Sequence, residues 1–515
     1  MVRRGWCVLA LFMIGLWGQA SHAASKDCHT LARLHHQRNI HNFLSSNDAL
    51  ARPSETLFVD SSSYGLRVHY AQETQEELAL ELLGYLEEAW VRQVEGLNYP
   101  APAIDDEAGG NDSFDLYLTS VSNGSALTVA EDLVETEAGV QQTSYILFDP
   151  SVSPEERALT IEHEFQHALQ FATDPQASLF FFEASAVYME TLAFPQNLAY
   201  AEVIPEYQSW PNAPFFTDGI RWQAQVNESS FYEYGGVLFL MFLEETYGEA
   251  DGALVAALWQ MSKDNDAAEN EPDFLDALAQ RGINLTDALL DFATWRSLVN
   301  IYAQDSAGPV GGNLWSGDAL MATQILTWAG LATPDVSLGT ATGLYRGGCL
   351  PFVFTAGDEP TTLAVEMTSN DPEYEIQNSI GVSVAVFDRE LTLTDRHPTR
   401  PEAVVWPFEI EATYRSTVLL VLCDAVGDWD ADEEPKFLDV SLKIYDADRP
   451  PESKPAQNAD ETDAGIVSLP PEEEVPNECG CQTTLSHHGA RGFSLLALSA
   501  VFLLLWNRRK SMPHE

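Results

Sequence analysis

Two histidines four residues apart, with a glutamate beside the first, are the residues whose spacing most directly predicts chemistry. His163, Glu164 and His167 form the pattern H-E-x-x-H. On a helix, side chains four positions apart share a face, so both imidazoles can bind one metal ion. The Glu164 carboxylate then lies beside the open side of the metal, where it can accept a proton from a bound water. This is the smallest residue set of a zinc hydrolase, and it predicts a Zn²⁺ cofactor.

The segment around this motif has the features of a helix. Ser153 and Pro154 are typical of an N-cap and a first helical position, and Glu156 predicts a capping box with Ser153. Apolar residues then recur at mostly helical spacing, and Asp174-Pro175 predicts the end of the helix. Because two buried imidazoles without a partner would be costly, we interpret the histidines as ligands rather than as core residues.

A third ligand is required, because a catalytic zinc ion normally takes three protein ligands and a water. A metzincin would need Gly and His where this chain has Gln170 and Thr173, which excludes that pattern. The next apolar block, 179–190, predicts a second buried helix. Glu183 lies among its aromatic residues, where a carboxylate needs a positive partner, and is the favoured third ligand. Glu190, two turns further on, is the alternative ligand, or an acceptor that orients a histidine ring.

Two tyrosines precede another apolar segment. Residues 231–236 read F-Y-E-Y-G-G and lead into the apolar residues 237–243. A tyrosine hydroxyl at the mouth of a buried helix can donate a hydrogen bond to the oxyanion of a tetrahedral intermediate. Taken alone, Tyr232 and Tyr234 fit packed side chains with solvated hydroxyls better, because tyrosines before apolar helices are common.

These three motifs together resemble the gluzincin metallopeptidases: H-E-x-x-H, a buried F-x-E-x-x-A-x-x-x-E helix, and a Y-E-x-G segment that opens an apolar helix. The resemblance covers roughly residues 54–300. The interval from His167 to Glu183 is shorter than in thermolysin-like or aminopeptidase-type gluzincins, and no exopeptidase anchoring motif is present. The chain therefore resembles more closely a group of secreted bacterial gluzincins found among myxobacterial metalloproteases.

The resemblance assigns roles to individual residues of this chain. It implies a general base, Glu164, and an oxyanion donor, Tyr232, with Tyr234 as the alternative donor. It implies zinc ligands at three positions, namely His163, His167 and Glu183.

The N-terminus predicts export. Residues 1–23 read as a signal peptide, with a basic start, an apolar run over 7–17 and small residues before the cleavage site. Residues 24–53 form an N-terminal segment, and its Cys28 has no evident partner.

The C-terminus predicts attachment to a membrane. Residues 448–478 are an acidic, Pro-rich linker. Residues 479–515 contain Cys479-Gly480-Cys481, an apolar run over 493–506 and a basic end. They resemble a MYXO-CTERM sorting tail, which implies retention in the membrane, processing by a sorting peptidase and delivery to the cell surface. The simpler alternative is a permanent single-span anchor.

Charge and cysteine content limit the partners and the compartment. The chain of 515 residues has a net charge of −52, which argues against nucleic-acid binding because such proteins need basic patches. Cys349 and Cys423 lie in one region and predict a disulfide in an oxidising compartment.

The periodicity predicts an α+β protein with two domains. Residues 54–335 would form a gluzincin-like zinc metallopeptidase domain, a small sheet plus a mainly helical lobe, and residues 340–447 an all-β sandwich accessory domain. The expected strands of the first domain are 66–70, 114–118 and 145–148, and its expected helices are 76–94, 238–247, 254–261, 274–280 and 285–303. The expected strands of the second domain are 361–367, 381–387, 408–410, 417–423 and 438–445.

Together these patterns predict a secreted or surface-attached zinc-dependent endopeptidase. Its partner would be a protein or peptide substrate that pairs with an edge strand of the small sheet. One alternative is a catalytically silent surface protein that keeps the fold for adhesion. The other is a zinc hydrolase of non-peptide substrates, since H-E-x-x-H defines the metal and the base but not the leaving group.

Overall fold

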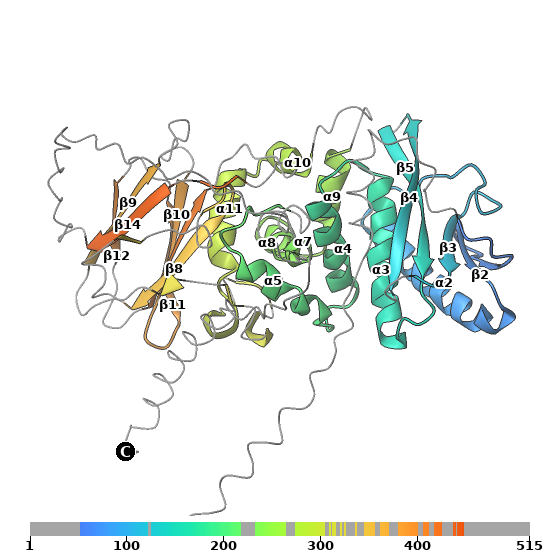
Figure 1. Ribbon diagram of the computed structural model, residues 1–515, viewed down its shortest axis with the longest axis horizontal. Coiled ribbons are helices and arrows are strands. Elements are labelled where there is room, and N and C mark those ends of the chain that lie inside the picture. The colour runs from blue at the N-terminus through green and yellow to red at the C-terminus, as the bar shows by residue number, and fades with distance from the viewer. Residues whose placement is uncertain are drawn as a thin grey trace, which may run out of the picture. The chain divides into compact units, whose positions relative to one another are not determined.

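Sheets and helices are combined in one chain, which confirms the α+β class (Figure 1). The computed structural model describes residues 52–446, apart from 122–124, 138, 218–231, 264–272, 304–307, 311, 316–319, 322–323, 326–334, 337–343, 356–360, 370–379, 400–404, 411–416, 425–435 and 439. The predicted signal peptide, Cys28, the acidic linker and the sorting tail lie outside the described residues.

The first sheet has the strand order β1-β2-β3-β5-β4. Its strands are β1 (Leu57–Asp60), β2 (Leu66–Tyr70), β3 (Phe114–Leu118), β4 (Ala126–Thr136) and β5 (Gly139–Phe148). The three central strands are parallel, and the edge strands β1 and β4 run antiparallel to their neighbours. The predicted strands 66–70 and 114–118 are confirmed, and 145–148 is the end of β5.

Helices cover one face of this sheet. Alternate residues of its strands point to opposite faces, and both faces carry apolar side chains. Leu116 and Ile146 belong to the main core, whereas Tyr117 and Tyr145 belong to a smaller cluster. The main-core face packs against α2 (Glu76–Trp90) and α3 (Pro154–Phe171), and Figure 1 shows α3 lying along β4 and β5. A π-helix, η3 (Val91–Gly96), extends α2, so the predicted helix 76–94 is confirmed.

Ser153 is the N-cap of α3 and Pro154 its first residue, as predicted. The predicted capping box is wrong: no side chain caps a backbone N–H there. The Ser153 hydroxyl instead donates a hydrogen bond of 2.8 Å to the Glu156 carboxylate. The two side chains of the first turn therefore hydrogen-bond to each other and not to backbone N–H groups. The pattern S-x-x-E fits this arrangement and a capping box equally well.

The middle of the chain is helical. After α4 (Leu179–Ala193) come α5 (Ile204–Ser209), α7 (Tyr232–Gly235), α8 (Val237–Tyr247), α9 (Ala253–Met261), α10 (Phe274–Gln280) and α11 (Leu285–Trp295). The predicted helix 285–303 is wrong in its second half. The Arg296 N–H closes the last turn of α11, and Asn300 adopts a left-handed backbone conformation with φ 51° that no α-helix can continue through.

Two further sheets follow. One has the order β11-β10-β13-β8-β6 and the other β12-β9-β14-β7. Their strands are β6 (Gln324–Ile325), β7 (Asp335–Val336), β8 (Cys349–Thr355), β9 (Thr361–Ser369), β10 (Ile380–Phe387), β11 (Leu393–Thr399), β12 (Val405–Ile410), β13 (Thr417–Asp424) and β14 (Val440–Asp446). Each of the five predicted strands corresponds to one of these. The predicted disulfide between Cys349 and Cys423 is confirmed, and it links directly opposed positions of β8 and β13.

These C-terminal strands contact the helical part through several specific interactions. Arg396 on β11 pairs with Asp291 on α11 at 3.2 Å, and Gly381 on β10 leaves room for Leu290. Backbone bonds also join the two parts: the Phe215 N–H donates to the Gly347 carbonyl and the Cys349 N–H to the Pro211 carbonyl, each at 2.7 Å.

Membrane-spanning capacity was predicted only for the C-terminal tail. Among the residues that the structure describes, no helix is both long and apolar enough to cross a membrane.

Candidate metal centre

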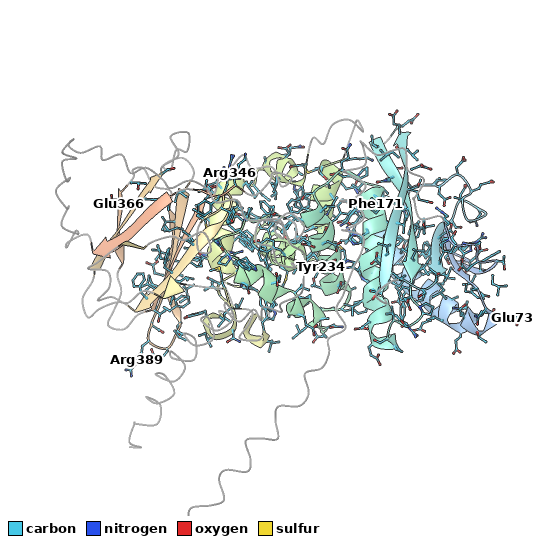
Figure 2. The ribbon with its side chains drawn as sticks, in the orientation of Figure 1. Glu73, Phe171, Tyr234, Arg346, Glu366 and Arg389 are labelled. Carbon is cyan, nitrogen blue, oxygen red and sulfur yellow. A yellow bond between two sulfur atoms is a disulfide. The ribbon has the colours of Figure 1, made fainter. Side chains whose placement is uncertain are left out.

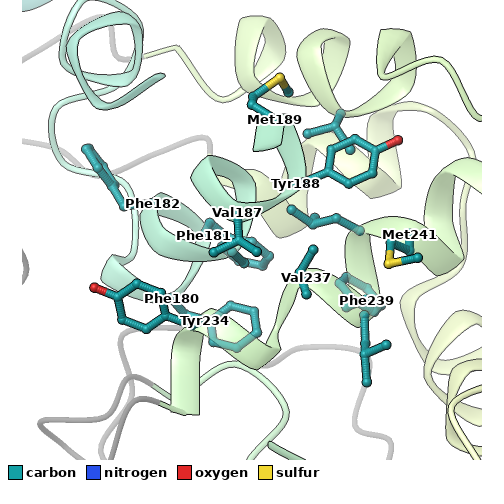
Figure 3. Close-up of a cluster of buried hydrophobic side chains, with 14 of the residues drawn as sticks. Phe180, Phe181, Phe182, Val187, Tyr188, Met189, Tyr234, Val237, Phe239 and Met241 are labelled. Carbon is teal, nitrogen blue, oxygen red and sulfur yellow. The ribbon is translucent and has the colours of Figure 1, made fainter. Parts of the chain in front are cut away.

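The predicted site forms where α3 packs against α4. The chain reverses between these helices at the predicted stop, where the Asp174 N–H donates to the Gln170 carbonyl, and Ser178 then caps α4 by accepting from the Phe180 N–H. Both helices are buried over the segments that carry the motif residues. Figure 3 shows Phe180 and Phe181 of α4 close to side chains of α7 and α8, whereas Phe182 points away from them and contacts Phe171 of α3 and Trp259 of α9.

Three potential ligands meet at one point. His163, His167 and Glu183 each offer one atom, and these atoms lie within 4.8 Å of one another. Oε2 of Glu183 lies 3.2 Å from Nε2 of His163 and 3.6 Å from Nε2 of His167. The imidazole planes are nearly perpendicular, at 87°, so the two rings approach this point from different directions.

The outer nitrogen of each imidazole has its own acceptor. Nδ1 of His163 lies 2.9 Å from Oε1 of Glu190, and Nδ1 of His167 lies 2.8 Å from Oε1 of Gln170. Carboxylate and amide oxygens accept, so each Nδ1–H donates outward, and each Nε2 is left facing Glu183, where it can bind a cation once it is deprotonated. Glu190 therefore occupies the orienting position that was its alternative role. The sequence reasoning missed Gln170, although it lies three residues after His167 and thus on the same helix face.

Gln170 is itself held by a buried chain of hydrogen bonds. Its amide donates to the Phe182 carbonyl at 3.0 Å and to the Ser185 hydroxyl at 2.9 Å. The indole of Trp259 on α9 also donates to Ser185, at 3.0 Å. Two donor contacts leave the amide oxygen facing His167, which fixes the orientation of the side chain.

The Glu183 carboxyl is completely buried and faces both imidazoles. Burial raises the pKa of its carboxyl, but His167 and His163, when protonated, lower it to about 2. Its second oxygen, Oε1, has no hydrogen-bond partner in the described part of the chain. One carboxylate oxygen and two imidazole Nε2 atoms thus face one point, and a cation there would neutralise the buried carboxylate.

A second buried carboxyl lies beside the motif on the opposite side. Glu162 is bonded by Arg92 and by the Gln93 amide, both on η3. Burial nevertheless raises the pKa of Glu162 to about 7, and nearby Glu190 contributes to the increase. The sequence reasoning did not single out this carboxyl.

Glu164 lies against the edge strand of the first sheet. The Thr128 hydroxyl, on β4, lies 2.6 Å from Oε2 of Glu164 and 2.8 Å from its carbonyl oxygen. Glu164 is 2% exposed, so this hydroxyl is a substantial part of its polar environment. Thr128 was not predicted, and no sequence spacing links it to a glutamate 36 residues later.

The two candidate tyrosines have different surroundings. The ring of Tyr234 lies nearly parallel to that of His163, with centroids 6.2 Å apart, and Figure 2 labels it in the helical part close to α4. The ring of Tyr232 instead packs against Tyr207 of α5, at 4.6 Å. The structure therefore brings Tyr234, the alternative, next to the ligand set, and places Tyr232, the first choice, among other residues.

Close packing explains why α7 presents Tyr234 in this way. A Cβ on Gly235 would lie 2.3 Å from Cβ of Tyr207, and one on Gly236 would lie 2.3 Å from the ring of Phe180. Only glycines let α7 lie this close to both α4 and α5.

No known protein-family model and no curated protein sequence matches this chain.

Proposed function

We propose that this protein is a zinc-dependent endopeptidase that is secreted or attached to the cell surface. The observation that carries the proposal is the convergence of His163, His167 and Glu183, with both Nε2 atoms facing one carboxylate oxygen. Two imidazoles and one carboxylate are a donor set that catalytic zinc favours, and they leave a coordination position for water or substrate.

The outer contacts fit the same metal. His163 donates to a carboxylate, Glu190, and His167 to an amide, Gln170, which are the kinds of partner that orient zinc-binding imidazoles. Zinc, when bound, supplies a Lewis acid that polarises the scissile carbonyl and lowers the pKa of a bound water.

The residues around the ligands would carry the proton and stabilise charge. Glu164 takes a proton from the attacking water and transfers it to the leaving amine, and the Thr128 hydroxyl holds the carboxylate in orientation. Tyr234 donates a hydrogen bond to the oxyanion of the tetrahedral intermediate. We prefer it to Tyr232 because its ring lies against His163.

An extended peptide would bind along β4. This strand is an edge of the first sheet in the described strand order and contains Thr128, so a substrate paired with it would pass close to Glu164. Pairing through main-chain hydrogen bonds suits a protease that accepts many sequences.

The finer architecture and the cellular context belong to the same proposal. The first sheet with α3 to α11 would be a gluzincin-like domain, and the two C-terminal sheets a β-sandwich that binds substrate or the cell surface. The disulfide between Cys349 and Cys423 supports an oxidising compartment and hence export. A sorting peptidase acting on the tail is the partner that the C-terminal resemblance implies.

The test is casein hydrolysis by the purified protein and by two variants, with zinc content measured for each. Glu164→Gln removes the proposed base, and Glu155→Gln makes the same change at an exposed position of α3. We expect all three proteins to bind zinc and only Glu164→Gln to lose turnover, by several orders of magnitude. Full activity of Glu164→Gln would refute the mechanism. Zinc binding without turnover in any of them would favour the binding-protein alternative or a non-peptide substrate.

A further inference from the structure

A completely buried arginine lies in the helical part, away from the ligand set. Arg296, at the C-terminal end of α11, is 0% exposed. Among the described residues, none of its three side-chain nitrogens makes a hydrogen bond of ordinary geometry, although the guanidinium interacts with the neutral Tyr207 and Tyr232 hydroxyls beside it. No carboxylate of the described residues lies within ion-pair distance of it, in contrast to Arg52, Arg67, Arg92, Arg157 and Arg396, each of which has a carboxylate partner.

Aromatic rings surround this guanidinium. Its central carbon lies 5.1 Å from the ring centroid of Tyr207 and 5.5 Å from those of Phe215 and Phe292. Tyr232 packs against Tyr207, and we call these five residues the Arg296 cluster. Cation–π contacts stabilise a cation over a ring face, but they provide no acceptor for the N–H groups at its edge.

The neighbouring phenols do not supply a negative charge. Burial raises the pKa of Tyr207 to about 12 and that of Tyr232 well above its ordinary value, although Arg296 opposes both shifts. Both hydroxyls are therefore neutral at physiological pH. The Tyr207 hydroxyl also donates to the Phe215 carbonyl, at 3.1 Å. Arginine remains protonated in proteins, so the cluster has one positive charge that its own residues do not balance.

We propose that the Arg296 cluster binds a small monovalent inorganic anion, such as chloride, against the guanidinium edge. One unbalanced charge calls for a single anionic charge. Arg296, Tyr207 and Tyr232 are each 0% exposed, so a substrate-sized anion would not reach them without moving the surrounding helices. The proposal does not depend on zinc or on peptide hydrolysis.

A salt-specific stability measurement tests this. Unfolding of the full chain is followed in sodium chloride and in sodium gluconate at equal ionic strength, because general screening in a chain of charge −52 is common to both salts. If one chloride binds only the folded state, each tenfold rise in its concentration above Kd raises the folding equilibrium constant about tenfold. Gluconate, whose anion is too large for the site, should give only the screening effect. Equal responses to the two salts would overturn the proposal.

Two variants locate the effect. Arg296→Met should abolish the difference between the salts. Arg396→Met removes an arginine that already has a carboxylate partner, Asp291, and should keep the difference. A chloride-specific effect that persists in Arg296→Met would place the anion elsewhere and refute the assignment.

If Arg296→Met does not fold, the unaltered chain still decides the matter. Bromide has the charge of chloride and scatters X-rays anomalously. Crystals grown in bromide should show an anomalous peak in contact with the Arg296 guanidinium. Its absence from an ordered Arg296 cluster would overturn the proposal.

Discussion

The hydrogen bond between His163 and Glu190 predicts a specific loss of zinc affinity. Glu190→Gln keeps the size and the acceptor oxygen of the side chain but removes its charge. A hydrogen bond to a charged group contributes about 1.5–3 kcal/mol and a neutral one about 0.5–1.5 kcal/mol. The midpoints of these ranges differ by about 1.2 kcal/mol, which corresponds to roughly an eightfold increase in Kd, near the lower end of the range for such orienting partners.

Zinc affinity can be measured by competition with a chromophoric chelator at fixed pH. Glu183→Gln is the comparison at the proposed ligand, and it should weaken binding far more than hundredfold. Glu156→Gln, on an exposed residue of the same helix as the histidines, should change nothing. Unchanged affinity in Glu190→Gln would mean that the contact does not orient His163. A loss as large as that of Glu183→Gln would make Glu190 a ligand and refute the assignment.

Three further perturbations have defined outcomes. Gly235→Ala should lower the free energy of unfolding by about 1–3 kcal/mol, because its Cβ would meet Tyr207. Gly84→Ala in α2, where the Cβ has open space, should instead raise the free energy of unfolding by up to about 1 kcal/mol. Denaturant titration measures both changes. The folded pKa of Glu162 is about 7, above the unfolded 4.5, so its stabilising contribution is complete below pH 4.5 and is lost as pH rises to 7. Between pH 4.5 and 7, the free energy of unfolding of Glu162→Gln should therefore rise by up to about 3 kcal/mol relative to that of the parent. Denaturant unfolding at several pH values measures this difference, and an opposite trend would contradict the burial argument. Thr128→Val should reduce kcat about tenfold or more with zinc content unchanged, and a loss of zinc instead would show that this hydroxyl supports the fold.

Local spacing allowed the shared face of the two histidines to be predicted, but not its surroundings. His163 and His167 share a helix face by backbone geometry alone, and Pro154 and Asp174 bound that helix in the sequence. Thr128 belongs to β4, whose place beside α3 depends on strand pairing, and no local pattern gives that pairing.

The choice between the two tyrosines shows the same limit more sharply. Tyr232 and Tyr234 both lie on α7, two positions apart, so a helix turns their side chains to different sides. Which of them faces His163 depends on how Gly235 fits against α5, and this is a matter of tertiary packing. The resemblance named Tyr232 first and Tyr234 as the alternative, and a sequence pattern does not contain the packing that brings the Tyr234 ring next to His163.

Errors among the strands have equally local causes. β8 was missed because Pro351 interrupts its apolar run, and the polar sequence of β11 lacks an apolar alternation. In the helix 285–303, apolar content continued beyond Trp295, where α11 ends, although the extended Val299 and the left-handed Asn300 prevent one continuous α-helix.

The backbone bonds between residues 211–215 and 345–349 determine how this protein can be divided. Apolar side chains at a boundary can be substituted by polar ones that tolerate solvent. Backbone N–H and C=O groups are present in every sequence, so substitution cannot remove their need for a hydrogen-bond partner. A protein cut after the helical part would leave the Pro211 carbonyl and the Phe215 N–H without their partners, and would also expose Leu290. The C-terminal strands thus act as part of the scaffold of the helical part, and transplanting α3 and α4 with their helical neighbours into another protein would mean transplanting β8 with them.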